Sequence, residues 1–226
     1  MSDKMKQESK VNHSYDRRSV LKLSGTALAA AVVPATASAN KPVSAKMVDS
    51  SNPESTEEFV KRSLELGETK EVANAYQDLS KEQLGVLRDA INRLSSYDLE
   101  VDERTTSSDV TTMAIPISKT ATLRKKIAGQ TVHKTNHTLD MTISGGKVRS
   151  ANNSSSGNAP VPLWHHKGLT GNYLDIQNNN SKAVSTRIHR YVHSVAGQVI
   201  TTDAATIDIS GYGGGGFNVR KNITHP

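Results

Sequence analysis

Several segments in the second half of the chain alternate apolar and polar residues, although Arg190 interrupts the apolar face of one of them, which predicts an edge strand or one that reaches past the core. The clearest such segments are residues 138–143, 184–193 and 205–210. A period of two residues predicts half-buried β-strands, and Gly145-Gly146 predicts a tight turn between two of them. Polar loops are expected at 152–158 and 178–181. Because no helical pattern separates the strands, we expect residues 113–226 to form an antiparallel β-sandwich or a barrel-like domain.

The first half shows helical patterns instead. Ser80 is followed three residues later by Gln83, which matches the capping box that begins many helices. Apolar residues then recur at spacings of three and four, which predicts a helix from about Lys81 to Ser95. A similar box at Ser55 predicts a second helix, and a short third helix is expected through 72–76.

Together these patterns predict an α+β protein, in which a short N-terminal helical segment precedes the β-rich domain. Charge divides along the same line: residues 40–110 contain 9 Lys/Arg and 15 Asp/Glu, whereas residues 111–226 contain 13 and 4. This asymmetry indicates either two modules that attract each other or a basic module with an anionic partner. The expected parts are a signal peptide (1–39), a linker (40–53), an acidic helical segment (54–98), a linker (99–112) and a basic β-rich domain (113–226).

The first 39 residues contain the three regions of a cleavable export signal. A charged stretch precedes an alanine-rich apolar run from about Leu23 to Val33, which is too short to span a bilayer. The A-x-A sequence formed by Ala37, Ser38 and Ala39 is typical of a site cut by signal peptidase. We therefore expect cleavage after Ala39 and no transmembrane segment in the mature chain.

A pair of arginines near the start of this signal resembles the twin-arginine (Tat) export motif. The matching residues are Arg17, Arg18, Val20, Leu21 and Lys22, with Val20 standing where the commonest form has Phe. The resemblance covers about residues 14–39, and this segment is similar to the signals of haloarchaeal and bacterial Tat substrates. It implies that the Tat export machinery is a partner, that the protein folds before crossing the membrane, and that it is secreted or lies at the cell surface.

Several classes of activity find no support in the sequence. There is no cysteine, which excludes disulfides, thiolate zinc sites and cysteine nucleophiles. The G-x-G-x-x-G at 211–216 is followed by only ten residues, none of them acidic, so a dinucleotide site is not expected. Histidines four apart on one strand lie about 13 Å apart, too far to share a metal ion. No catalytic residue, cofactor, metal site or nucleic-acid partner is predicted.

One face of the strand over 184–193 carries the residues best suited to an anionic target. Arginine, histidine and tyrosine occupy alternate positions there, and we expect this face to be exposed, either as a binding surface or as an ordinary solvated face. Acidification would add charge to it through the histidines. The candidate binding residues are Arg187, His189, Tyr191, His193, Arg124, Lys125, Lys126 and Trp164.

Three hypotheses follow for the function. The first is a bacteriocin-like antimicrobial precursor, whose acidic helical segment is a pro-region and whose basic β-domain binds an anionic envelope component. The second is an intact cell-surface module that binds glycan or mediates adhesion. The third is a secreted hydrolase with a dispersed active site, which the scarcity of clustered acids and histidine–acid pairs disfavours. A non-enzymatic exported protein is the expectation.

Replacing Arg17 and Arg18 together by lysine should retain the full-length chain in the cytosol, because the paired arginines are the feature that resembles the export motif. Cell fractionation and intact-mass spectrometry of the culture supernatant measure this. A single secreted species that begins at Asn40 supports an intact module, whereas a fragment that begins within about residues 105–130 supports the precursor. Secretion of the doubly substituted chain at the normal level would contradict the Tat assignment.

Overall fold

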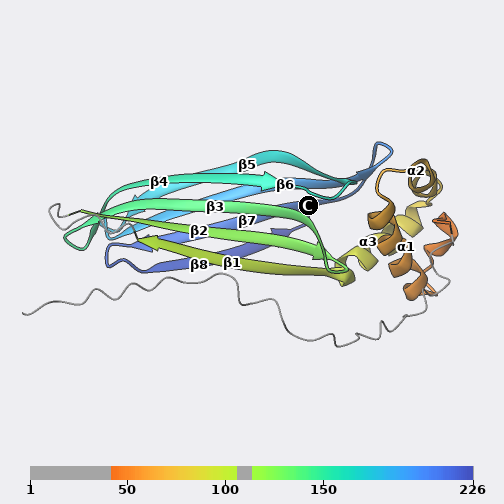
Figure 1. Ribbon diagram of the computed structural model, residues 1–226, viewed down its shortest axis with the longest axis horizontal. Coiled ribbons are helices and arrows are strands. Elements are labelled where there is room, and N and C mark those ends of the chain that lie inside the picture. Colours follow the sequence, from red (N-terminus) through yellow and green to blue (C-terminus); the bar gives the residue numbers. More distant parts are fainter. Residues whose placement is uncertain (1–41, 106–113, 226) are drawn as a thin grey trace, which may run out of the picture. The chain divides into compact units, whose positions relative to one another are not determined.

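The computed structural model describes residues 42–105 and 114–225 (Figure 1). The signal motif and the cleavage site lie outside the described residues. Residues 42–226 form one compact unit, so the acidic helices and the basic strands are parts of the same body.

Eight strands form two four-stranded antiparallel sheets, in the orders β1-β2-β3-β4 and β5-β6-β7-β8. Each sheet pairs strands that are consecutive in the sequence, and the two share one apolar core, an arrangement consistent with the expected β-sandwich. The strands are β1 (Ser95–Thr105), β2 (Ile115–Ile127), β3 (Gln130–Ser144), β4 (Lys147–Asn158), β5 (Trp164–Gln177), β6 (Lys182–Val195), β7 (Gln198–Tyr212) and β8 (Phe217–Thr224).

Short turns with left-handed backbone set the register of the hairpins. The predicted turn at Gly145-Gly146 is confirmed, with φ of 59° and 70°. Ala128-Gly129 and Ala196-Gly197 also have positive φ at both positions. Two such residues in succession give the type I′ turn, whose twist matches that of paired strands.

Three helices precede the strands: α1 (Pro53–Leu66), α2 (Lys70–Gln77) and α3 (Lys81–Leu94). The prediction of α3 and of its capping box is confirmed, since Gln83 N donates to Ser80 Oγ at 3.2 Å and Ser80 N donates to Gln83 Oε1 at 3.0 Å. Arg88 of α3 donates through Nε to the carbonyl of Ile200 at 2.6 Å, which ties the helices to the β6–β7 hairpin.

Four local predictions are wrong. The helix expected from Ser55 begins earlier, because Asn52 caps it and Pro53 supplies the first turn with a fixed φ. Residues 43–48 are packed rather than a polar linker, since Val43 and Val48 are buried. Gln83 Nε2 donates to the carbonyl of Ala45, the first residue of the 3-10 helix η2 (Ala45–Met47), and to that of Val48, which follows it. The expected linker 99–112 is strand β1 as far as Thr105, and the expected loop 152–158 lies within β4.

β1 places the acidic end of the first half directly beside the basic strand β2. Ion pairs join Asp98 to Lys126 at 2.5 Å and Glu100 to Arg124 at 2.7 Å. A third pair, Glu103 with Lys119 at 2.8 Å, lies further along the same two strands. The opposite charges of the two halves therefore meet as neighbouring strands of one sheet.

The glycine-rich sequence at 211–216 serves the close packing of the two sheets. A Cβ on Gly213 would overlap the carbonyl carbon of Gly146 at 2.6 Å and approach Lys147 Cα at 3.0 Å, so the β7–β8 hairpin can meet the β3–β4 turn only without a side chain there. Gly213 N also donates to Ser181 O of the β5–β6 turn at 2.8 Å. Three turns from both sheets therefore converge on this glycine.

Gly213→Ala should lower the free energy of unfolding by about 1–3 kcal/mol, because backbone atoms must move to admit the methyl group. Gly214→Ala is the matched control, since a Cβ there meets nothing within 4 Å. Urea denaturation of both variants measures the difference. Equal stability of the two variants would mean that the turns do not meet as described.

Candidate functional site

The stripe expected to be an exposed binding face lies inside the sandwich. Arg187 is 8% exposed, His189 3%, Tyr191 0% and His193 2%. Of the other candidates, Lys125 and Trp164 are also buried. The prediction that β6 shows this face to solvent is therefore wrong, and these residues cannot contact a target from the closed sandwich.

β6 turns this face inward because the opposite sheet offers hydrogen-bonding partners. Tyr191 OH lies 2.8 Å from Thr135 Oγ1 and donates to Lys134 O at 2.7 Å. His137 lies 2.8 Å from Ser185 Oγ through Nε2 and 2.9 Å from Ile207 O through Nδ1. Paired in this way, Tyr191 and His137 enter the core without the large cost of an unmade hydrogen bond.

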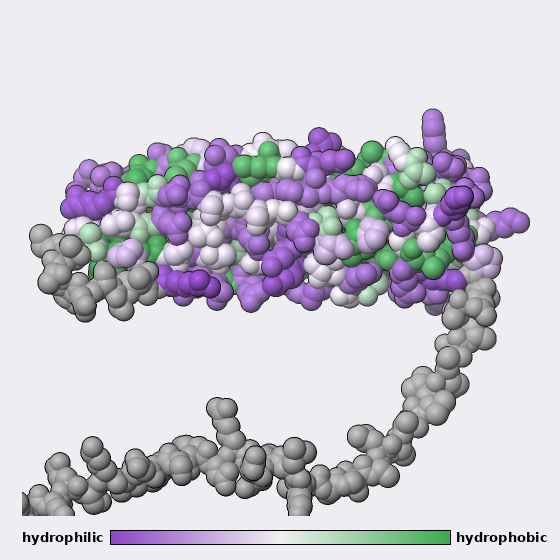
Figure 2. All heavy atoms as spheres, turned by 45° about the horizontal axis from the view of Figure 1, so that its top comes forward, coloured by the Kyte–Doolittle hydropathy of each residue, from purple (hydrophilic) through white to green (hydrophobic). Residues whose placement is uncertain are grey.

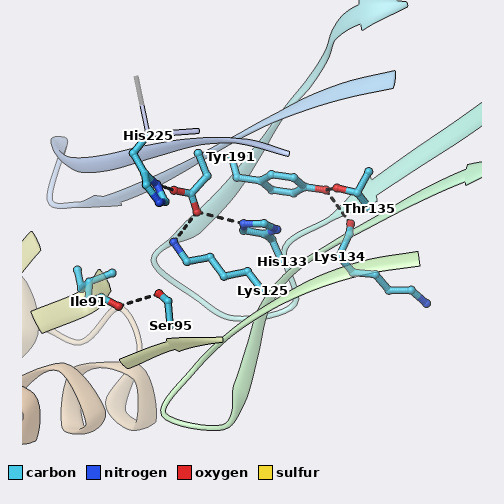
Figure 3. A network of polar contacts seen from close by, with 9 residues as sticks. Ile91, Ser95, Lys125, His133, Lys134, Thr135, Tyr191 and His225 are labelled. Carbon is cyan, nitrogen blue, oxygen red and sulfur yellow. Dashed lines mark hydrogen bonds and ion pairs between the residues drawn. The ribbon is translucent and has the colours of Figure 1, made fainter. Parts of the chain in front are cut away.

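A buried ion pair lies in this layer near the β2–β3 turn (Figure 3). Lys125 Nζ of β2 and Asp203 Oδ2 of β7 are 2.7 Å apart, and neither side chain is exposed to solvent. Burial raises the pKa of Asp203, but the hydrogen bond from His133 and the charge of Lys125 outweigh it and bring the pKa to about 2. Burial lowers the pKa of Lys125 and the charge of Asp203 opposes that shift. The pair therefore links the two sheets as two ions.

Two histidines complete the coordination of the carboxylate. His133 Nε2 lies 3.1 Å from Asp203 Oδ2, and His225 Nδ1 lies 2.7 Å from Oδ1 (Figure 3). The ring of His133 also stacks on Tyr191, with centroids 4.0 Å apart and planes within 7°. We define the inter-sheet polar core as Lys125, His133, Thr135, His137, Ser185, Arg187, His189, Tyr191, His193 and Asp203.

Trp164 belongs to the boundary of this core and not to a binding surface. Its ring stacks on His193 at 5.1 Å, and Lys125 Nζ lies 5.0 Å from its centroid. An indole face attracts a cation, so it stabilises the buried ammonium alongside Asp203. Within the described residues, neither ring nitrogen of His193 has a hydrogen-bond partner.

The nearest approach to a catalytic arrangement is a hydrogen-bonded row between β4, β6 and β5. Ser155 Oγ lies 3.0 Å from His189 Nε2, and His189 Nδ1 lies 2.8 Å from His166 Nε2. Burial, followed by the charges of His166 and Arg187, lowers the pKa of His189 to about 4. A base of that pKa draws a proton from serine weakly at neutral pH, so this row does not favour a hydrolase.

The last two sequence candidates lie on the outer face of β2 and are already paired. Arg124 and Lys126 are partly exposed, and each contacts a carboxylate of β1. They lie across the sheet from the other candidates, so the structure does not unite the predicted residues in one site.

A surface hollow that sequence reasoning missed lies on the outer face of the second sheet. It has a volume of about 240 Å³ and is lined by Lys182, Val184, Asp208, Ser210, Tyr212, Asn218 and Arg220. The signal for it lies in the strand register, which places Lys182 opposite Tyr212 and Asp208 opposite Arg220. Those pairings could not be read before the strand order was known.

The lining of this hollow combines two cations, one carboxylate, an aromatic ring and the amide of Asn218. Lys182 Nζ lies 5.7 Å from the centroid of the Tyr212 ring. Asp208 Oδ1 accepts from Thr186 Oγ1 at 2.5 Å. Within the described residues, neither Lys182 nor Arg220 has an ion-pair partner within 4 Å. The hollow can therefore accept an anionic or hydroxyl-rich group.

Further observations concern metal ligands, membrane-spanning helices, the surface and related proteins. Across residues 42–105 and 114–225, no group of three or more metal-ligating side chains is placed to hold an ion, and no helix is long and apolar enough to cross a membrane. On the face shown in Figure 2, apolar residues lie in separate groups among hydrophilic ones. Comparisons with models of protein families, with curated proteins and with solved structures found no match.

Asp203→Asn should destabilise the protein by about 3–5 kcal/mol, because Lys125 would stay buried without its counter-ion. The double variant Lys125→Met with Asp203→Asn should recover much of that loss, since it removes both charges from the core. Urea unfolding of the two single variants and the double variant gives the coupling energy. A cost for Asp203→Asn of less than about 1 kcal/mol would contradict the buried ion pair.

Proposed function

We propose that this chain is an exported, non-enzymatic module that binds an anionic glycan of the cell envelope or its surroundings. The observation that carries the proposal is the hollow on the second sheet, where Lys182 and Arg220 flank Tyr212 and Asn218. Cationic side chains suit carboxylate or sulfate groups, and tyrosine and asparagine suit the faces and hydroxyls of sugar rings. The export signal predicted from residues 1–39 would deliver such a module to its target.

The intact module is favoured over a cleaved precursor. β1 belongs to the acidic half, yet it pairs with β2 from Ser95 to Thr105 and supplies the three ion pairs described above. Buried residues of α1, α2 and α3 share the same apolar core as the strands. Release of residues 42–105 would expose that core and leave β2 as an unpaired edge, which promotes aggregation.

A non-catalytic role agrees with the chemistry of the described residues. The only carboxylate buried among them, Asp203, is held by Lys125 and two histidines. The row of Ser155, His189 and His166 lacks a strong base. Binding through exposed side chains needs neither group.

Replacing both Lys182 and Arg220 by alanine should weaken binding to a sulfated polysaccharide such as heparin about tenfold or more, because two cations leave one contact region. The matched control removes two exposed lysines of the helices, Lys61 and Lys81, and so lowers the net charge equally. Isothermal titration at low salt measures both variants. An equal loss in the two double variants would indicate non-specific attraction and overturn the assignment of the hollow.

Neutral dextran gives the second comparison. Tight binding of dextran that survives the loss of Lys182 and Arg220 would show recognition of sugar hydroxyls at another surface. No binding of either polymer by the intact protein would overturn the glycan proposal itself.

A further inference from the structure

The space between the two sheets is unusually rich in histidine. His133 and His137 of β3 and His189 and His193 of β6 are all buried there, and His166 of β5 is half-buried beside them. β3 belongs to one sheet and β5 and β6 to the other, so both sheets contribute histidines to the layer. Protonation of these histidines therefore changes the free energy of the packing between the two sheets.

The fixed charges in the same layer leave little to balance a protonated histidine. Lys125 and Arg187 are buried cations, and Asp203 is the only buried carboxylate in the part of the chain that the structure describes. Both oxygens of Asp203 are occupied, Oδ2 by Lys125 and His133 and Oδ1 by His225. Each further proton in this layer adds a cation without a free counter-ion.

His193 is the clearest case. It lies between the stacked ring of Trp164 at 5.1 Å and the edge of Tyr76 from α2 at 5.9 Å, with no partner for either ring nitrogen in the described chain. The charged and titratable groups around it are Lys125, Asp203 and His165. Burial, followed by the charge of Lys125, lowers its pKa to about 3.

His137 is held neutral by a different environment. Ser185 and the carbonyl of Ile207 contact its two ring nitrogens. The charged and ionisable groups that act on it are Arg187 and His189 in the layer and Asp208 on the outer face of the second sheet. Burial lowers its pKa to about 4, although the carbonyl contact and Asp208 oppose the shift.

The remaining histidines have their own neighbours. Burial lowers the pKa of His133, against the hydrogen bond and charge of Asp203, while Lys125 and His225 add to the lowering. Tyr191, the other titratable group in contact with it, stays neutral because burial raises its pKa to about 12. His166 and His189 face each other at 2.8 Å, with Arg187 nearby, so protonation of one opposes protonation of the other.

We propose that the neutral inter-sheet histidines are an acid-sensitive latch, and that the sandwich opens when the surrounding medium becomes mildly acidic. The closed layer holds these histidines neutral beside Lys125 and Arg187, and opening lets them take up protons in water. Acid therefore favours the open form. The inference does not rest on glycan binding, because opening is measured without any ligand.

The pH range follows from the direction of the pKa shifts. An unfolded histidine takes up a proton near 6.5, whereas His137 in the folded protein does so only near 4. Between these values the unfolded state binds more protons, so stability is present above pH 6.5 and is lost as the pH falls toward 4. Asp203 has a pKa of about 2, so loss of the ion pair comes at lower pH and is distinguishable.

Trp164, the only tryptophan of the chain, reports on this layer directly. The experiment follows its fluorescence during urea unfolding of the full chain at steps from about pH 7.5 to about pH 4.5. As the pH falls below about 6.5, the unfolding equilibrium constant should rise about tenfold for each pH unit and for each histidine that is protonated only on unfolding.

His193→Phe supplies the decisive variant, because phenylalanine keeps the stacking but cannot titrate. For each pH unit of acidification, the factor by which its unfolding constant rises should be about ten times smaller than that of the parent. Its acid transition should move to lower pH. His165→Phe is the control, since the side chain of His165 is 40% exposed and lies outside the buried layer, with Glu68 as its ion-pair partner at 3.7 Å. That variant should follow the parent.

Two results overturn the proposal. One is an unfolding constant that stays unchanged down to about pH 4.5. The other is a parent and a His193→Phe variant with the same pH dependence. Should His193→Phe not fold, His189→Gln tests the same point, because its amide can still reach Ser155 and His166.

Discussion

The contact between Lys125 and Asp203 is the interaction on which the arrangement of the two sheets depends. It joins β2, an inner strand of one sheet, to β7, an inner strand of the other, through two ions that are both withdrawn from water. Isolated ions at such depth cost several kcal/mol each, so this pairing requires good geometry and further partners. His133, His225 and the face of Trp164 supply them, and each holds its position only if the sheets keep this register.

The pairing of β1 with β2 explains how a chain with an acidic first half and a basic second half forms one compact unit. The acidic first half ends in β1, and the basic second half begins with β2, so antiparallel pairing sets carboxylates beside amines. Exposed pairs of this kind contribute little individually, about 0–1 kcal/mol each. Their larger effect is on the distribution of charge, because they neutralise three cations of β2. Lys182 and Arg220, on the other sheet, have no ion-pair partner among the described residues.

Local signals in the sequence predicted the elements well and their faces poorly. The capping box at Ser80 and the turn at Gly145-Gly146 depend on neighbouring residues alone, so they could be read directly. A period of two in β6 shows that its faces differ, but it does not say which one is buried. That choice depends on partners such as Thr135 and Asp203, which lie 56 and 12 positions away from Tyr191.

Strand β1 was missed for a related reason. Its alternating carboxylates disfavour a strand in isolation, and only the amines of β2 make them acceptable there. The hollow on the second sheet was missed because Lys182, Asp208 and Arg220 come from three strands.

Strands β6 and β7 carry both the latch and the hollow, on opposite faces. In a strand, neighbouring side chains point to opposite sides, so Ser185 lies inside against His137 while Thr186 lies outside against Asp208. The hollow is lined by residues of these strands and of β8, so its shape depends on their pairing. If the sheets separate, β6 and β7 lose their packing against the first sheet. The proposed protonation of the histidines in the core would then also alter the lining of the hollow on the outer face.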